Sequence, residues 1–134
     1  MMKISILGLG LAVLAVPAAA QAIDWKKAQR IEIAMTNHGY APRKIVLKGG
    51  APYILRVVNP SDRTHNLSAK EFFAATRVDP RDRALVDMDQ LKLAPGESAV
   101  LHMIAPRTPG ARYPFHSTQI ADAASDLDGN FFIR

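Results

Sequence analysis

The clearest strand signal in this chain is Tyr53-Ile54-Leu55-Arg56-Val57-Val58, followed by Asn59-Pro60-Ser61-Asp62. Its first six residues are rich in β-branched and aromatic side chains, which favour a β-strand. Its last four combine Asn, Pro, Ser and Asp, and these residues favour a tight turn. A short strand that stops at a turn is the repeating unit of a β-sheet protein, and similar units lie on both sides of this stretch.

Further strand patterns extend outward from it in both directions. Upstream, Ile31, Ile33 and Met35 alternate with other residues at the period of two that is typical of a half-buried strand. The other predicted strands cover 44–48, 66–69, 91–93, 98–105, 111–117 and 130–133. Only 70–75 is expected to be helical, and the charged, proline-containing stretch 79–83 is expected to be a loop. Seven to eight short strands at this spacing predict an all-β Greek-key sandwich with one short helical segment.

Composition narrows the possible functions. A chain of 134 residues is long enough for one domain with a modest core. It contains no cysteine, so a disulfide framework, a thiolate ligand and a cysteine nucleophile are all excluded. The formal net charge of +5 favours acidic partners or anionic surfaces. Because no Lys/Arg-rich run occurs, a nucleic-acid partner is not expected.

The N-terminus has the three parts of a secretory signal peptide. Lys3 precedes an apolar stretch over 4–16, and Ala20-Gln21-Ala22 matches the small-x-small pattern of a cleavage site. The alternative, an uncleaved membrane anchor, is disfavoured because a span needs about 20 apolar residues. We therefore expect a signal peptide over 1–22, a mature domain over 23–134 and a periplasmic location. No second apolar stretch could cross a membrane, so stable insertion after cleavage is not expected.

Five segments of the chain resemble, in order, segments of the cupredoxins. They are Tyr40-Ala41-Pro42, the strand 53–59 with His65-Asn66, the turn Leu93-Ala94-Pro95-Gly96-Glu97-Ser98, the segment Pro109-Gly110-Ala111-Arg112-Tyr113-Pro114-Phe115-His116-Ser117, and Leu127-Asp128-Gly129. The resemblance covers most of the mature chain. It implies a cupredoxin-like sandwich with a former metal site at one end.

The copper ligands of that family are mostly missing here. A blue-copper centre uses two His and one Cys, with a weak axial Met. The resemblance places His65 at the first histidine, Ser117 at the cysteine and Leu127 at the methionine, and it finds no histidine in 120–123. A serine hydroxyl stays protonated at neutral pH and cannot replace a thiolate. The resemblance therefore implies that rapid electron transfer through a blue-copper centre is lost.

An altered metal site is still a hypothesis for this end of the sandwich. The cupredoxin topology would gather the loop with His38, the loop with His65 and the loop 117–127 at the same end. The candidate ligands are His65, His38, His116, Glu71 and Asp122. Imidazole and carboxylate suit Cu(II) or zinc, and methionine suits Cu(I). If a cofactor is bound, we expect copper, as Cu(I) or Cu(II).

Each candidate also has a simpler interpretation. His65 could serve only as a hydrogen-bond partner of a neighbouring carbonyl, and His38 could simply be solvated in its turn. His116 would point away from the site, because successive residues of a strand face opposite sides. Asp122 could solvate the last loop, whereas Glu71 carries only a weak signal from its position after His65.

Asn66 has a different expected role. We expect its side chain to tie two loops together by hydrogen bonds rather than to touch a ligand. A second resemblance includes it: Tyr53-Ile54-Leu55-Arg56, Asn59, His65-Asn66 and Glu71-Phe72-Phe73 are similar to the cupredoxin-like domains of periplasmic iron- and copper-associated proteins of the EfeO type. That similarity implies metal trafficking and slightly strengthens the case for Glu71 as a ligand.

Two functions follow as hypotheses. The first is a periplasmic protein with a non-blue, altered site that binds or handles copper or another divalent metal. The alternative is a degenerate cupredoxin that acts as a metal-free protein-interaction module with a periplasmic partner. Enzyme activity is not expected, because Ser117 and His116 are neighbours on a predicted strand and point to opposite faces.

Overall fold

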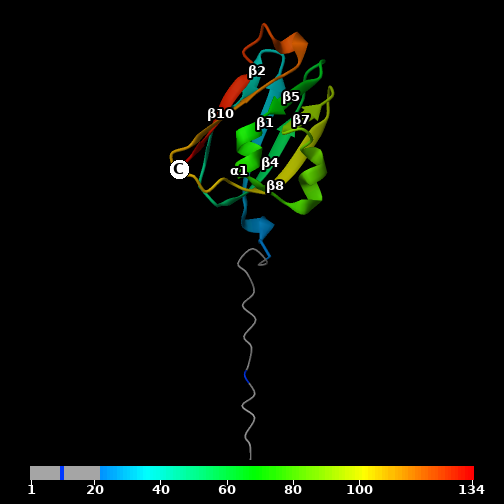
Figure 1. Cartoon of the computed structure of the whole chain (residues 1–134). Coiled ribbons are helices and arrows are strands. Elements are labelled where there is room, and N and C mark those ends of the chain that lie inside the picture. Colours follow the sequence, from blue (N-terminus) through cyan, green and yellow to red (C-terminus); the bar gives the residue numbers. More distant parts are fainter. Residues whose placement is uncertain (1–9, 11–21) are drawn as a thin grey trace, which may run out of the picture.

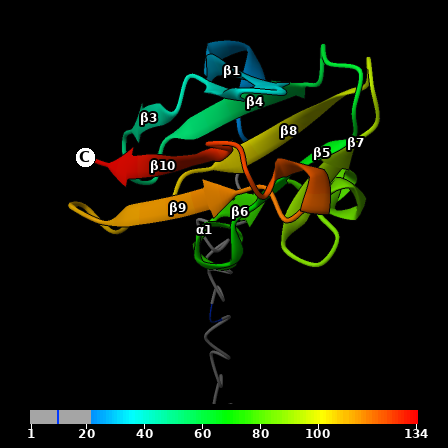
Figure 2. The same ribbon diagram turned by 90° about the horizontal axis from the view of Figure 1, so that it is seen from above.

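The computed structural model describes Gly10 and residues 22–134, and residues 22–134 form two β-sheets that pack face to face (Figure 1). The predicted signal peptide over 1–22 lies outside the described residues, apart from Gly10 and Ala22. Of the helices in the described part of the chain, none is long and apolar enough to cross a membrane. The view in Figure 2 shows the two layers of the sandwich from above.

The first sheet has the order β2-β1-β4-β8-β6. Its strands are β1 (Gln29–Thr36), β2 (Gly39–Ala41), β4 (Pro52–Val58), β6 (Arg77–Val78) and β8 (Ser98–Ile104). β1 and β4 run parallel, and the other pairs are antiparallel. Residues 53–58 belong to β4, the central strand, and Leu55 and Val57 on its inner face are fully buried.

The second sheet has the order β3-β10-β9-β5-β7. Its strands are β3 (Lys44–Leu47), β5 (His65–Ser68), β7 (Gln90–Leu93), β9 (Arg112–His116) and β10 (Asp128–Ile133). β10 pairs parallel with β3 and antiparallel with β9. The predicted all-β sandwich is therefore confirmed. The described residues hold ten strands rather than seven or eight, because β2 and β6 are too short to show a period in the sequence.

The predicted helix over 70–75 is confirmed as α1 (Lys70–Ala75). The expectation of a loop over 79–83 is wrong, because a 3-10 helix, η3 (Pro80–Leu85), occupies this stretch. The side chain of Asp79 accepts a hydrogen bond from the backbone N–H of Arg81, and Pro80 is the first residue of η3. The N-terminus of η3 is therefore capped by residues that are common at helix N-termini. Two single-turn 3-10 helices complete the described part: η2 (Trp25–Lys27) and η4 (Ile120–Asp122).

The core lies between the two sheets. Phe72 of α1 stacks on Phe131 of β10 with 3.9 Å between ring centroids, and α1 thereby closes one side of the sandwich. Gly129 leaves room for the ring of Phe115, because a Cβ atom at position 129 would lie 2.3 Å from Cζ of that ring. Aromatic packing in this core therefore depends on the absence of a Cβ atom at position 129, that is, on glycine.

The two ends of the sandwich carry different loops. We call one end the pole: it consists of the loops 37–38, 59–64, 94–97 and 117–127. The opposite end, here called the base, consists of 22–28, 48–51, 105–111 and Arg134. Backbone hydrogen bonds tie the segments of each end together, for example from Asn59 to Glu97 at the pole and from Gly49 to Arg134 at the base.

Candidate functional site

His65 is the centre of a buried polar cluster at the pole. It is the first residue of β5, and 0% of its surface is exposed. Its Nδ1 atom lies 2.7 Å from Oδ2 of Asp122, and its Nε2 atom lies 2.9 Å from Oδ1 of Asn37. Both ring nitrogens are therefore engaged by side chains from two other pole loops.

Asp122 collects hydrogen bonds from three segments. It is the last residue of η4 and is only 4% exposed, so it does not simply solvate the last loop. Its Oδ2 atom accepts from the hydroxyl of Ser117 at 2.6 Å and faces the ring of His65. Its Oδ1 atom lies 3.4 Å from Nη2 of Arg63, which adds a positive charge beside the carboxylate.

The orientation of the Asn37 amide determines how His65 is bonded. The amide nitrogen donates to Oδ1 of Asp62 at 2.8 Å, and the amide oxygen accepts from Nε of Arg63 at 3.2 Å. The amide oxygen therefore also faces His65, so the Nε2 atom of His65 is a donor. Because Nδ1 faces the carboxylate of Asp122, each ring nitrogen has an acceptor opposite it.

Two neighbouring groups respond to these charges. The hydrogen bond from Asn37 is the main cause that holds the pKa of Asp62 below its usual value, and the positive charges of Arg63 and His65 act in the same direction. Burial raises the pKa of Tyr40 far above its usual value, and the carboxylates of Asp122 and Asp128 add to this rise. The hydroxyl of Tyr40 donates to the backbone oxygen of Asn66 at 2.5 Å.

Asn66 ties the pole loops together, as predicted. Its amide nitrogen donates to Gln90 and, at 2.6 Å, to the hydroxyl of Thr118. Its amide oxygen accepts from the hydroxyl of Ser117 at 3.0 Å and from the backbone N–H of Thr118 at 2.8 Å. Ser117 thus donates its hydroxyl within reach of two acceptors, Asn66 and Asp122. The segment after β9 is fixed to β5 by these bonds.

The structure brings together only some of the predicted site residues. His65, Asp122 and Ser117 meet at the pole, and Leu127 is buried nearby, with its backbone oxygen accepting from the N–H of Ser117 at 3.0 Å.

The other three candidates are exposed. His38 lies beside Asn37, and its backbone N–H bonds to the hydroxyl of Thr36. His116 lies opposite Asp128 in the sheet, one residue before the inward-facing Ser117. Glu71 lies on α1. In the part of the chain that the structure describes, no hydrogen bond or ion pair joins His38, His116 or Glu71 to His65 or Asp122.

Two residues of the cluster were not among the predicted candidates. They are Asn37 and Arg63. Neither carries a local signal of its role, because their side-chain partners in the cluster lie 25 to 59 positions away in the sequence.

The donor atoms at the pole do not fit a blue-copper centre. The cluster offers one imidazole, one carboxylate and one hydroxyl, whereas such a centre needs sulfur ligands and two imidazoles. Each of these donors already has a hydrogen-bond partner, and the guanidinium of Arg63 lies beside the carboxylate. Within residues 22–134, no group of three or more His, Cys, Asp and Glu side chains could hold a metal ion.

Comparison with known proteins agrees with this fold. The model of the cupredoxin-like domain family matches residues 6–122, so this chain belongs to the family of cupredoxin-like domains. Among solved structures, it is similar to dithionite-reduced auracyanin from the photosynthetic bacterium Roseiflexus castenholzii. That pair shares 20% sequence identity with a TM-score of 0.58, over 80% of this chain and 98% of the auracyanin.

A second similar structure is auracyanin B, with 19% identity and a TM-score of 0.56 over 80% of this chain and 89% of that one. At these identities the likeness establishes the fold alone. A search of curated protein sequences found no match.

Proposed function

We propose that this chain is a periplasmic cupredoxin-like protein that works as a metal-free protein-interaction module. The observation that carries the proposal is the carboxylate of Asp122, which accepts hydrogen bonds where the family's metal would need ligands. The periplasmic location is supported by the predicted signal peptide over 1–22. The buried cluster keeps the pole loops in place, and the residues above it are free to contact a partner.

Inserting a metal ion into this cluster would be costly. The ion would have to displace the hydrogens that His65 and Ser117 share with Asp122. It would also add positive charge within a few ångströms of Arg63, in a site with little water to screen the repulsion. Removing the partners of buried polar groups costs roughly 1–3 kcal/mol for each group, and more for charged ones.

The surface above the cluster offers an anchor for a partner. Ile120 in η4 is 94% exposed, so its apolar side chain is fully accessible to a partner. It borders a groove of about 590 Å³, which is lined by Arg63, Thr64, Thr118, Gln119, Ile120 and Ala121. An apolar anchor within a polar rim is the usual centre of a protein–protein interface.

Cross-linking in periplasmic extract tests this proposal. We expect the purified protein to capture a defined partner with equal yield in buffer with and without a strong chelator. Ile120→Ser should abolish capture, whereas Val46→Ser should not, because Val46 is an exposed residue of β3 away from the pole. Capture that disappears with chelator, or that survives Ile120→Ser unchanged, would contradict the proposal.

An altered, non-blue metal site is the second candidate function. It is favoured by the approach of an imidazole nitrogen and a carboxylate oxygen at 2.7 Å, since both suit Cu(II) or another divalent ion. His65 and Asp122 would hold the ion; His38, His116 and Glu71 would contribute only after a rearrangement. When bound, copper would supply a Lewis-acidic, redox-active centre.

Calorimetric titration with Cu(II), Cu(I) and Zn(II) separates the two candidates. One-to-one binding that weakens at least tenfold in His65→Ala, but not in the exposed-histidine variant His38→Ala, would favour metal handling. Binding that is equal in both variants would reflect surface histidines only and would count against a pole site.

We further propose that the protein is not an enzyme. Nucleophilic catalysis by Ser117 would need a base that accepts its proton, and in acyl transfer this base is usually a histidine. Here the hydroxyl of Ser117 is bonded to Asp122 and Asn66, while the ring of His65 bonds to the same carboxylate. Ester hydrolysis that is abolished by Ser117→Ala would contradict this view.

A further inference from the structure

The base of the sandwich gathers positive charge from four separate segments. Lys26 and Lys27 lie in η2, Lys48 follows β3, Arg107 lies in the loop after β8, and Arg134 ends the described chain. All five side chains are exposed. Among the ion pairs of the described residues, none involves any of the five. Their charges are therefore available to an outside partner.

The fold holds three of these cations around one groove. Lys48, Arg107 and Arg134 line a hollow of about 370 Å³ together with Gly49, Gly50 and Pro109. The N–H of Gly49 donates to the backbone oxygen of Arg134, and the N–H of Gly50 donates to the backbone oxygen of Ala105. Backbone bonds thus place three cationic segments side by side, and this grouping does not depend on their side chains.

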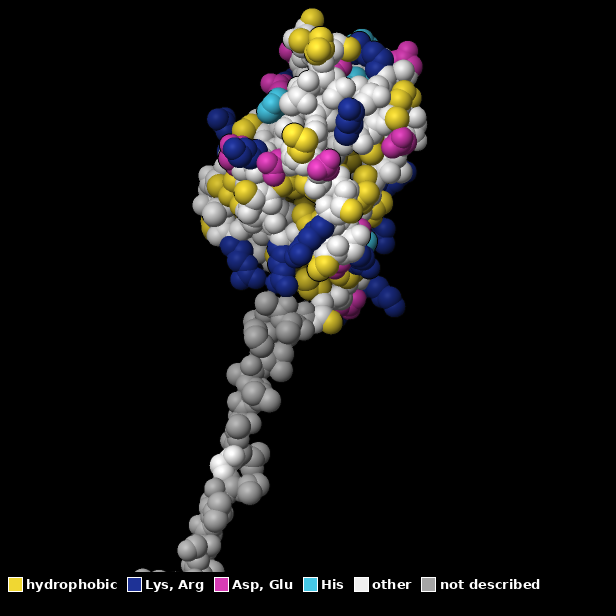
Figure 3. Space-filling model, turned by 45° about the vertical axis from the view of Figure 1, so that its right-hand side comes forward, with side chains coloured by type: hydrophobic (Ala, Val, Ile, Leu, Met, Phe, Trp, Pro, Cys, Tyr) yellow, Lys and Arg dark blue, Asp and Glu magenta, His cyan; other side chains and the backbone are white. Residues whose placement is uncertain are grey.

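The opposite end of the molecule has the opposite character. The pole carries Asp62, Glu97, Asp122, Asp126 and Asp128 on or beside its loops. On the face drawn in Figure 3, Lys and Arg side chains surround the lower end of the domain, while most Asp and Glu side chains lie higher. Asp24 is an acidic residue of the base, and its side chain accepts from the backbone N–H of Lys26.

The base is also where the chain enters the domain. Trp25 is partly exposed there; its ring lies edge-on to His102 at 5.1 Å, and Arg81 lies over it at 5.8 Å. A tryptophan beside cationic side chains is typical of a membrane–water interface. The predicted signal peptide over 1–22 joins the domain at this end. If it is cleaved after Ala22, the new α-ammonium of Ile23 adds another positive charge to the base.

We propose that the base binds the surface of membranes that contain anionic lipids. Each cationic side chain near such a surface contributes attraction, and the attraction falls off within a Debye length. An acidic protein would satisfy the same charges, but the position of the partly exposed Trp25 beside them favours lipid. Binding at the surface requires no insertion of the domain.

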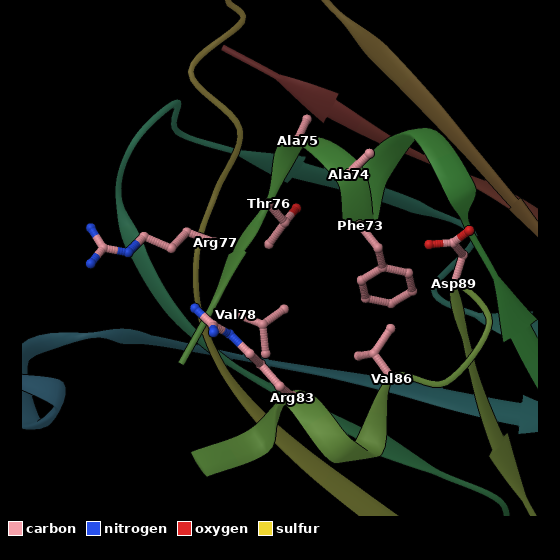
Figure 4. Close-up of a pocket in the computed structure, with 9 residues that line it drawn as sticks. All are labelled: Phe73, Ala74, Ala75, Thr76, Arg77, Val78, Arg83, Val86 and Asp89. Carbon is pink, nitrogen blue, oxygen red and sulfur yellow. The ribbon is translucent and has the colours of Figure 1, made fainter. Parts of the chain in front are cut away.

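Other surfaces of the molecule carry weaker cases for a ligand. The hollow of about 570 Å³ in Figure 4 is lined by Phe73, Val78, Val86 and Arg83, among others, but Asp89 lies in the same wall. Its charges therefore do not select one class of ligand, whereas the groove at the base has no acidic side chain in its lining.

Vesicle flotation with the secreted protein tests the lipid proposal. We expect binding to phosphatidylglycerol-containing vesicles but not to pure phosphatidylcholine, with release at high salt. Trp25 is the only tryptophan, so its emission should shift to the blue when the base meets lipid. The triple variant Lys48→Gln, Arg107→Gln and Arg134→Gln should lose affinity on the order of a hundredfold, since each cation contributes roughly fivefold.

A matched control has the same change in net charge. The variant Lys70→Gln, Arg83→Gln and Lys92→Gln removes three exposed cations from elsewhere in the chain and should bind vesicles nearly as well as the parent. Equal losses in both variants would mean general attraction to net charge and would overturn the proposal. It would also be overturned by absence of binding at low salt, by binding without a change in Trp25 emission, or by preferential binding to polyglutamate.

Discussion

The hydroxyl of Ser117 donates to Oδ2 of Asp122 at 2.6 Å, across five positions of the sequence. The turn η4 makes this contact possible, because it brings the chain back toward the end of β9. The same carboxylate oxygen faces His65 of β5 at 2.7 Å. A single carboxylate therefore joins the loop after β9 to the first residue of β5.

Loss of that carboxylate should loosen the pole. We expect Asp122→Asn to destabilise the protein by about 1–3 kcal/mol, because the buried ring of His65 and the hydroxyl of Ser117 lose their carboxylate acceptor. Urea denaturation monitored by circular dichroism measures the change. The exposed Asp126→Asn is the control and should stay within about 0.5 kcal/mol of the parent. Equal stability of the two variants would show that the Asp122 pair contributes nothing.

Introducing copper ligands at the pole tests whether this cluster can be converted into a blue-copper centre. Ser117→Cys alone should not produce the intense visible absorption of a Cu(II)–thiolate centre, since a single thiolate and His65 do not complete the trigonal set. Adding Asp122→His and Leu127→Met supplies the missing ligand types, and the change at buried Leu127 nearly conserves volume. We expect the triple variant to develop the absorption with Cu(II). A coloured single variant would contradict this account.

The buried phenol of Tyr40 should make stability depend on alkaline pH. Its pKa is raised in the folded state by burial, so above about pH 10 the unfolded chain loses a proton that the folded chain keeps. Stability from this group is therefore fully present below pH 10 and falls as pH rises further, by up to about 1.4 kcal/mol per pH unit. Tyr40→Phe should reduce this slope while costing roughly 1 kcal/mol at neutral pH for the lost bond to Asn66.

Denaturation curves between about pH 8 and about pH 11 give both quantities for Tyr40, because this range runs from about two units below the pKa of an unfolded tyrosine to about one unit above it. An unchanged slope in Tyr40→Phe would show that the phenol ionises equally well in the folded protein.

The core beneath β10 should not tolerate a side chain at position 129. A Cβ atom there would lie 2.3 Å from Cζ of Phe115 and 2.6 Å from the backbone oxygen of Arg43. We expect Gly129→Ala to destabilise the protein by about 1–3 kcal/mol or more, because the buried ring has no room to move. Thermal unfolding measures the effect.

A second substitution checks the cause. Phe115→Leu removes the ring atoms that the new methyl group would meet, so the double variant Phe115→Leu with Gly129→Ala should be more stable than the sum of the single effects predicts. If the effects of the two substitutions on stability simply add, the strain in Gly129→Ala comes from the contact with the backbone oxygen of Arg43 instead.

Most of the fold could be predicted from local patterns. Strands β1, β4 and β8 show the alternation or the β-branched composition of their type, and turn residues separate them. The short strands β2 and β6 could not be predicted, because two or three residues cannot display a period. The 3-10 helix at Pro80–Leu85 was mistaken for a loop, although Asp79-Pro80 carries a capping signal.

The candidate site was predictable only in part. His65 and Asp122 were among the predicted ligands, yet their actual contacts involve Asn37 and Arg63 from distant loops. His38 is a predicted ligand, whereas the contact with His65 is made by its neighbour Asn37. Long-range side-chain pairing depends on how the loops meet, and a single sequence does not reveal that.

The separation of base and pole has an electrostatic consequence. β4 has seven residues, which at about 3.3 Å per residue span roughly 23 Å. This length is well beyond the Debye length of about 8 Å at physiological ionic strength, so a charge altered at one end is hardly felt at the other. Together, the cationic end and the acidic end give the domain a permanent dipole. Near an anionic bilayer this dipole would rotate the molecule before first contact, leaving Ile120 directed toward the aqueous compartment.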